Sequence, residues 1–160
     1  MATAGRIRIG GIMSFRDLCL IGVMSAPDRP GLASAIFQAL GEAHLNTQFI
    51  VQCIDLNRNA HVLFCIAQED CARVLKTVEP VARKIGAQRV THYQPVALLS
   101  VFGPDFRERP GIAGAAFGAL AAVGINILAV STSISTISCV IDGHCFDQAL
   151  QALYTVFELP

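Results

Sequence analysis

The sequence lacks the charge imbalance that is typical of nucleic-acid-binding proteins. Its 160 residues carry 12 basic and 12 acidic side chains, so the formal net charge is zero, and no basic run occurs. Affinity for nucleic acids comes mainly from cations that neutralise phosphates. Aromatic side chains, which stack on the bases of RNA, make up only 7% of the chain. These two shortages argue against a nucleic-acid partner.

Motifs of common catalytic and cofactor sites are absent as well. The chain has no phosphate loop, dinucleotide fingerprint or pair of catalytic carboxylates, and its four histidines show no metal-ligand spacing. The adjacent His144 and Cys145 suggest a thiolate activated by a base, and the hydroxyls of residues 131–133 suggest an anion site. Neighbours along a chain rarely face each other, and exposed hydroxyls need no ligand, so we expect structural roles for both. We predict no catalytic residue, no metal site and no cofactor.

Paired cysteines are missing too. The six cysteines show no C-x-x-C spacing, and most lie in apolar, strand-like runs, which is typical of free buried thiols. A disulfide framework is not expected in a chain with 53% hydrophobic residues. Residues 1–10 contain no apolar stretch long enough for a signal peptide. These features predict a reducing, cytoplasmic location.

A short turn that occurs twice organises the chain. Residues 28–32 (D-R-P-G-L) open one apolar segment, and residues 108–112 (E-R-P-G-I) open another 80 positions later. The register holds beyond the turn, where Ala33, Ala35, Phe37, Leu40 and Asn46 match Ala113, Ala115, Phe117, Leu120 and Asn126. Such a run of matches in one frame indicates an internal repeat, and hence two small domains.

The repeat also decides how one long apolar segment is interpreted. No charged residue occurs from Pro110 to Ile141, and the run 112–130 is long enough to span a bilayer. The matching run 32–50 carries several polar side chains, among them Glu42 and Gln48. The shared architecture is therefore a short helix followed by a strand, and we predict no membrane segment.

Apolar periodicity predicts one element order for both repeats. In the first, we expect strand 18–23, helix 32–44, strands 46–56 and 61–66 with a hairpin turn at 57–59, helix 70–85 and strand 89–93. In the second, we expect strand 97–102, helix 111–123, strands 126–133 and 137–141, and helix 145–157. Gln94-Pro95 is the only candidate linker, and Pro80 is expected to kink or divide its helix.

The second repeat lacks its last strand. Adding the offset of 80 to residues 89–94 gives 169–174, which lie beyond the sequence. Subtracting 80 instead gives 9–14, where the alternating strand predicted at 6–12 lies. An unpaired sheet edge is a liability, so we predict that the N-terminal strand completes the second sheet. The predicted fold is α+β, with two βαββαβ domains. Residues 14–95 form the first, which is inserted within a second made of residues 1–13 and 96–160.

One helix face differs between the repeats. The first repeat has Ser34, Gln38 and Glu42 where the second has Gly114, Gly118 and Ala122. A helix that is apolar all round is usually buried, and small residues allow close approach. We therefore predict that another helix packs on this face, either from the other repeat or from a second copy, and we expect a two-fold homodimer.

The turn at 28–31 has two interpretations. One is an acidic residue that caps the following helix in an ordinary turn. The other is a binding site in which backbone N–H groups at the start of the helix, unblocked at Gly31, face a carboxylate while Asp28 receives an ammonium group. The second arrangement suits the two ends of an amino acid.

The residues around the two turns resemble a known family. The run D-R-P-G-L-A-S-A-I-F-Q-A-L-G-E-A-H-L-N, followed by F-I-V-Q, resembles the first of the paired ACT domains of aspartokinases. The run R-P-G-I-A-G-A-A-F-G-A-L-A-A-V-G-I-N-I-L-A-V-S-T-S, followed by I-S-C-V-I-D, resembles the second. The resemblance covers about Gly11 to Leu159, and the kinase portion is absent. It implies the separate regulatory subunit that some aspartokinases have, or a stand-alone sensor of the same build.

This resemblance implies a fold, a ligand and a site. The fold is a pair of ferredoxin-like ACT domains that associate through sheets and helices, and the ligand is a feedback amino acid, typically threonine or lysine. Asp28 would meet the amino group of the ligand, and Gln52 would supply a side-chain contact. The backbone of Gly31, Leu32 and Ala33 would meet its carboxylate, and Asn126 and Ile127 would contribute from the facing domain.

The predicted function is a non-catalytic, amino-acid-binding regulatory module that acts by population shift. Its partners would be an amino-acid effector, a second copy of the chain and a catalytic kinase subunit. The main alternatives are an oligomerisation module without a ligand and the regulatory fragment of a complete aspartate kinase. Two further hypotheses are less favoured: first an enzyme, and then an RNA-binding ferredoxin-like domain. The sequence does not name the amino acid.

Overall fold

The chain forms two compact units. The computed structural model describes residues 5–104 and 106–160. One unit is Asp17–Pro95, and the other joins the N-terminal segment, as far as Arg16, to Val96–Pro160. The first domain was expected to begin at residue 14, whereas this unit begins at Asp17; both place its end at residue 95.

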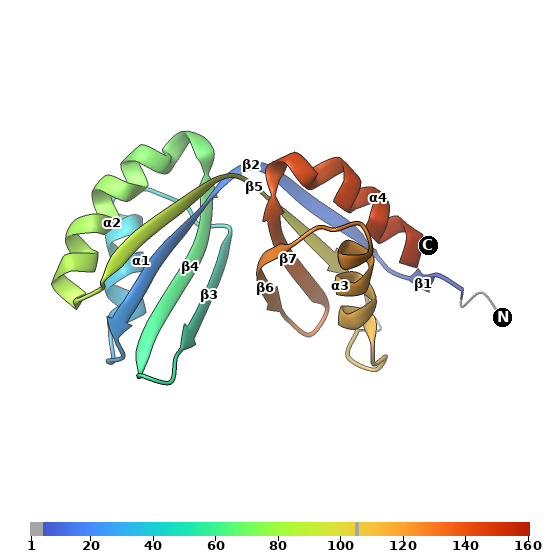
Figure 1. Ribbon diagram of the computed structural model, residues 1–160, viewed down its shortest axis with the longest axis horizontal. Helices are drawn as coiled ribbons and strands as arrows, with labels where there is room; N and C mark the ends of the chain where they lie inside the picture. The colour runs from blue at the N-terminus through green and yellow to red at the C-terminus, as the bar shows by residue number, and fades with distance from the viewer. Residues whose placement is uncertain (1–4, 105) are drawn as a thin grey trace. The chain divides into compact units, whose positions relative to one another are not determined.

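In the unit Asp17–Pro95, two helices cover one face of a sheet (Figure 1). The helices are α1 (Leu32–Glu42) and α2 (Cys71–Ile85), and a 3-10 turn, η1 (Gln68–Asp70), precedes α2. The strands are β2 (Gly11–Pro27) from Asp17 on, β3 (Phe49–Ile54), β4 (Asn59–Ala67) and β5 (Arg89–Phe102) as far as Pro95. Their order across the sheet is β3-β4-β2-β5, and β4 is antiparallel to both β2 and β3. This is the strand order of a ferredoxin-like βαββαβ domain.

The core of this unit lies between the helices and the sheet. Alternate residues of each central strand point to the helices, as the two-residue period of a strand requires, and the helices contribute residues at three- and four-residue spacing. The buried core residues on these elements include Cys19, Ile21, Val23, Val62, Phe64, Leu32, Ile36, Leu40, Val74, Val78 and Ala82. Phe37 of α1 meets Phe64 edge-on, with 5.3 Å between ring centroids.

The second unit repeats this architecture with a different connection. Its elements are the later part of β5, α3 (Ile112–Ala122), β6 (Ile127–Thr132), β7 (Thr136–Asp142), η2 (Gly143–Cys145), α4 (Phe146–Val156) and β8 (Phe157–Glu158). The sheet order within the unit is β2-β5-β7-β6, with β7 antiparallel to β5 and to β6. The last strand of the ferredoxin-like order is therefore the beginning of β2, supplied from the N-terminal end of the chain.

The N-terminal segment serves this unit in two pieces, so the single strand predicted at 6–12 is wrong. β1 (Ile7–Arg8) pairs in parallel with β8 as a separate two-stranded sheet. The chain then changes partner, because the Gly10 amide donates to the Phe102 carbonyl at 2.8 Å. A Cβ on Gly10 would lie 2.9 Å from the Phe102 ring, so the close approach of the two strands needs a glycine here.

Three predicted interruptions do not occur. The strand predicted at 18–23 is part of β2, which runs from Gly11 to Pro27 even though Asp17 has a positive φ of 54°. The strands predicted at 89–93 and 97–102 are both part of β5, so Gln94-Pro95, at the boundary between the two units, connects them within a continuous strand. Pro80 lies within α2, which continues from Cys71 to Ile85 without division.

The uncharged stretch of the second unit is a helix and strands. α3 ends at Ala122, and no helix in residues 5–104 and 106–160 is long and apolar enough to cross a membrane. Gly114, Gly118 and Ala122 are exposed on α3, and a Cβ added to either glycine would meet no atom within 4 Å. Among the described residues, none therefore lies against the open side of the two glycines.

The placement of Ile9 yields a test of the domain connection. Ile9 is 1% exposed and belongs to the core formed with residues 96–160. Ile9→Ala should therefore destabilise the second unit by about 2–5 kcal/mol. We expect faster hydrogen exchange in residues 97–102 and 137–141, with little change in β4 of the first unit. Met13→Ala is the matched control, because Met13 is 45% exposed. Unchanged exchange in residues 97–102 would contradict the proposed domain connection.

Candidate functional site

The turn between β2 and α1 presents an open helix N-terminus. Gly31 is the N-cap of α1 in the left-handed conformation, with φ of 91°, and no side chain caps the helix. A Cβ added at Gly31 would meet no atom within 4 Å, so the space beside this backbone is open. Leu32, 5% exposed, anchors the first residue of α1 in the core. The turn therefore holds its backbone N–H groups at the surface while the helix behind it is fixed.

The predicted site residues of the first unit lie at one end of it. Asp28 is exposed, and its amide donates to the Arg58 carbonyl at 3.1 Å. Gln52 is exposed on β3 and opposite Val62, a residue of the helix-covered face. β2 and β3 both run antiparallel to β4, so Gln52 lies towards the end of the sheet at which β2 enters the turn. Ala33 is half-buried on α1.

The remaining two predicted residues belong to the second unit. Asn126 is exposed just before β6, and Ile127 is the first residue of that strand. The structure therefore gathers Asp28, Gly31, Leu32, Ala33 and Gln52 in one unit and leaves these two in the other.

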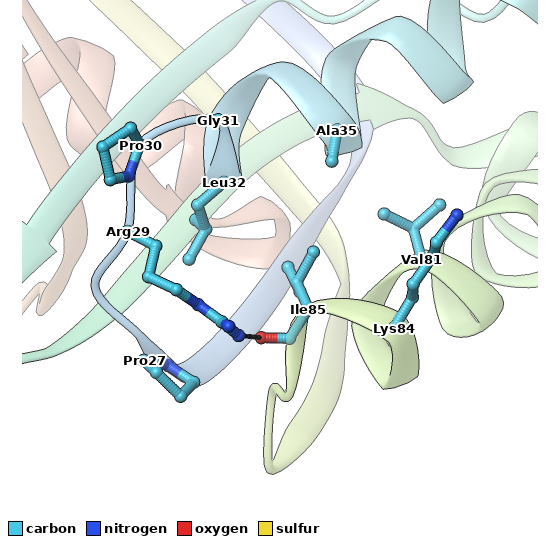
Figure 2. Close-up of a pocket in the computed structure, with 9 residues that line it drawn as sticks. All are labelled: Pro27, Arg29, Pro30, Gly31, Leu32, Ala35, Val81, Lys84 and Ile85. Carbon is cyan, nitrogen blue, oxygen red and sulfur yellow. Dashed lines mark hydrogen bonds between the residues drawn. The ribbon is translucent and has the colours of Figure 1, made fainter.

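A cavity of about 370 Å³ lies beside the same turn. It is lined by residues of the turn, of α1 and of the C-terminal end of α2, namely Pro27, Arg29, Pro30, Gly31, Leu32, Ala35, Val81, Lys84 and Ile85. Figure 2 shows the Arg29 side chain crossing from the turn towards α2, where its guanidinium donates to the Ile85 carbonyl at 3.1 Å. Gly31 and Leu32 line the cavity, whereas Asp28, Ala33 and Gln52 do not. The sequence did not predict this second side of the turn.

A histidine that sequence reasoning classed as scattered supports the approach to this turn. Ser25 has a positive φ of 56° at a register shift between β2 and β4, and its amide donates to His61 Nδ1 at 3.1 Å. The other ring nitrogen, Nε2, lies 2.9 Å from Asp55 Oδ2. Because Nδ1 accepts a backbone N–H, Nε2 carries the proton and donates it to Asp55. His61 thus ties the bulge before the turn to the hairpin between β3 and β4.

Asp55 organises that hairpin. Its Oδ1 atom accepts from the Asn57 and Asn59 amides at 2.8 and 3.0 Å. The Asn59 amide first, and then the His61 ring, hold the pKa of this carboxyl below its ordinary value of 3.8. The hairpin predicted with its turn at 57–59 is present, but its loop is 55–58, because β3 ends at Ile54 and β4 already begins at Asn59. Its anchor, a carboxylate that accepts two amides, was not predicted.

The second unit has a related but smaller site. Gly111 is the N-cap of α3 with the same φ of 91°, and a cavity of about 270 Å³ adjoins it. Arg109, Thr132 and Ser133 are among its lining residues. Thr132 occupies the position that matches Gln52 in the repeat, so in this unit the cavity opens on the strand side of the turn. Glu108, the counterpart of Asp28, is exposed and does not line it.

The ring of His144, the chain neighbour of Cys145, contacts an acidic side chain. His144 Nδ1 lies 2.9 Å from Asp142 Oδ1, and its side chain is 80% exposed. Across residues 5–104 and 106–160, no three histidine, cysteine or acidic side chains are placed to hold a metal ion. The open helix N-termini remain the features with a binding chemistry.

The hairpin anchor yields a test with pH. Asp55 is bound in its charged form, so its contribution to the free energy of unfolding is present above about pH 4 and is lost as pH falls through the lowered pKa. Asp55→Asn should therefore melt at a lower temperature than the wild type at neutral pH. We expect the difference to shrink between about pH 4 and pH 2 in thermal melts. The control is Glu79→Gln, an exposed position on α2. A difference that stays constant down to pH 2 would contradict this role.

Comparison with known proteins gives the same result for both halves of the chain. ACT-domain profiles match residues 20–85 and residues 99–157. An aspartate kinase of Pseudomonas putida is 30% identical over 151 residues; these are 94% of this chain and 37% of the kinase. This chain therefore spans little more than a third of the length of that relative.

Solved structures of separate regulatory subunits match over nearly their whole length. The ligand-free regulatory subunit of aspartate kinase from Thermus thermophilus has a TM-score of 0.84 and 29% identity, with 94% of this chain and 99% of that chain covered. The regulatory subunit from Thermus flavus has a TM-score of 0.84 and 27% identity, with coverage of 92% and 97%.

Proposed function

Because the chain contains two ACT domains and is homologous to aspartokinases, we propose that it is a non-catalytic regulatory module that binds an amino-acid effector. The observation that carries the proposal is the uncapped N-terminus of α1, reached through Gly31, with an exposed aspartate three residues before it. Its similarity to separate regulatory subunits over 97% and 99% of their length supports a regulatory role. We propose that the protein is cytoplasmic. We also propose that a catalytic aspartate kinase subunit responds to effector binding.

The proposed site recognises both ends of an amino acid. Backbone N–H groups at the start of α1 carry a partial positive charge and favour the ligand carboxylate. Asp28 supplies the opposite charge for the ammonium group, and Gln52, at the same end of the unit, adds a neutral contact. Asn126 and Ile127 of a second ACT domain would close the site. An effector of the threonine or lysine type fits this class.

Regulation then follows from a shift in population. An effector that binds one arrangement of the ACT domains more tightly than another favours that arrangement, by an amount set by the difference in affinity. A kinase subunit that binds the favoured arrangement then responds to the effector, although the kinase subunit itself does not touch the amino acid. An oligomerisation module without a ligand is the alternative, and the exposed glycine face of α3 is the observation that favours it. A second version of the same proposal is that the chain is the regulatory fragment of a complete aspartate kinase.

Matched substitutions in the two repeats test the ligand site. A thermal-shift screen of the twenty amino acids identifies the effector, and calorimetry then measures its affinity. Asp28→Ala should weaken binding roughly ten- to more than a hundredfold, because a hydrogen bond to a charged group contributes about 1.5–3 kcal/mol. Gln52→Ala should weaken it less. Glu108→Ala, at the matching exposed position, should leave affinity nearly unchanged.

Two results would count against this site. Equal affinity of Asp28→Ala and the wild type would remove the turn from the binding site. A screen in which no amino acid raises the melting temperature would favour the oligomerisation module.

Self-association through α3 is proposed as the route to a two-fold homodimer. Ala122→Glu places a charge on its exposed small-residue face and should lower the mass in solution from dimer to monomer, because an unpaired charge in an interface is costly. The matching position of the first repeat is already Glu42, so the helix itself tolerates the change. Gln151→Glu, exposed on α4, is the control. Light scattering decides the outcome: a dimer that survives Ala122→Glu shows that this face is not the interface.

A further inference from the structure

Two buried cysteines of the first unit are in contact. Cys19 lies on β2, and Cys71 is the first residue of α2. Their Sγ atoms are 3.2 Å apart, close enough for one thiol to donate to the other. Cys19 is fully buried, whereas Cys71 is 7% exposed. Both belong to the core between the helices and the sheet.

The strand register explains why these two sulfurs meet and a third does not. Cys19 lies opposite Ile66, which points towards the helices, and α2 begins above this part of the sheet. Cys65 is next to Ile66 on β4, so its side chain points to the opposite face. Cys65 is buried as fully as Cys19. Cys65 is therefore a suitable control, because it is as buried as Cys19 but points to the face of the sheet away from Cys71.

We propose that Cys19 and Cys71 form a reversible disulfide when the protein meets a hydroperoxide. The two sulfurs must approach by roughly 1 Å to reach bonding distance, since an S–S bond is about 2.05 Å long. The bond would link β2 directly to the start of α2. The cysteines of the described chain are free, as expected where disulfides form only transiently.

The reaction has two balanced steps. Cys71, the thiol with some exposure, attacks one peroxide oxygen; the O–O bond breaks, and a sulfenic acid and water are produced. Cys19 then attacks the Cys71 sulfur, the S–O bond breaks, and the disulfide and a second water are released. The two thiols together lose two electrons and two protons, and the peroxide is reduced to two molecules of water. A dithiol reductant reverses the change by thiol–disulfide exchange.

The environment of Cys19 suits the second step better than the first. Burial first, and then the hydrogen bond with Cys71, raise the pKa of Cys19 to about 12. A thiol held in its protonated form is a poor first nucleophile, because the thiolate is the reactive species. The sulfenic acid on Cys71 is an electrophile within reach of the Cys19 sulfur, because the two sulfurs are already in contact and need to approach by only about 1 Å. The Cys19 proton leaves with the sulfenic oxygen as water.

Oxidation should stabilise the first unit. A disulfide restricts the unfolded chain, and here it would close a loop of about fifty residues. The melting temperature of the oxidised protein should rise by about 5 °C or more, and a reductant should restore the original value.

The experiment uses the full chain with Cys53→Ser, because Cys53 is exposed and would react on its own. The protein is treated with hydrogen peroxide under native conditions, unfolded, alkylated and weighed. Trypsin then yields peptides 17–58 and 59–73, in which Cys19 is the only remaining cysteine of the first, and Cys65 and Cys71 share the second. The matched variants are Cys71→Ser, with Cys71→Ala as a second form in case the serine disturbs folding, and Cys65→Ser.

We expect the treated protein to carry two alkyl groups fewer than the untreated control and, apart from these groups, to be about 2 Da lighter, with peptide 17–58 joined to 59–73. The link should persist in Cys65→Ser and disappear in both Cys71 variants. The proposal is overturned if all thiols of the treated protein remain open to alkylation after unfolding. It is overturned equally if the link survives replacement of Cys71, or if Cys71 gains oxygen without forming a bond to Cys19.

Discussion

Pairing between β2 and β5 is the interaction on which both units depend. One part of each strand belongs to the unit Asp17–Pro95, and the other part belongs to the second unit. In each unit, these two strands lie side by side in the sheet. In one unit, the Gly10 amide just before β2 donates to the Phe102 carbonyl of β5. In the other, a Cβ added at Gly22 of β2 would clash with the Thr91 side chain of β5, so the two strands approach closely there. Backbone groups in a sheet must be paired. Because one domain is inserted within the other, both β2 and β5 find a hydrogen-bonding partner along their length in each unit.

The repeat made the helices and hairpins predictable, because it combined local turn signals with a fixed offset. Pro30-Gly31 and Pro110-Gly111 predicted the starts of α1 and α3 to within one residue. The strand ends were less predictable. Asp17 with a positive φ and Pro95 within β5 are both residues that usually end a strand, and only pairing with distant segments keeps the strands continuous. The bond from Ser25 to His61 spans 36 residues, and the cavity beside Arg29 depends on where α2 ends. Neither has a local signal.

The two repeats have kept one backbone and changed their side chains. The N-caps Gly31 and Gly111 have the same φ of 91°, and the turns after α1 and α3 both need a positive φ. The second repeat meets that need with Gly124, whereas the first uses His44 at φ of 55°. A histidine there is strained relative to glycine. The first repeat carries Asp28 and a polar helix face, and the second carries Glu108 and a face of glycine and alanine. This divergence is consistent with binding in one repeat and association through the other.

The placement of the closing strand has a consequence for the order in which the chain folds as it is made. The first unit is complete in sequence once Pro95 has left the ribosome, so its sheet can close at that point. The N-terminal segment that contains Ile9 has no sheet to join until residues 96–160 follow, since its partners are Phe102 and Glu158. Contacts of such long sequence separation form slowly. The second unit is therefore completed after the first unit has folded, and its N-terminal segment stays unpaired until residues 96–160 have been made.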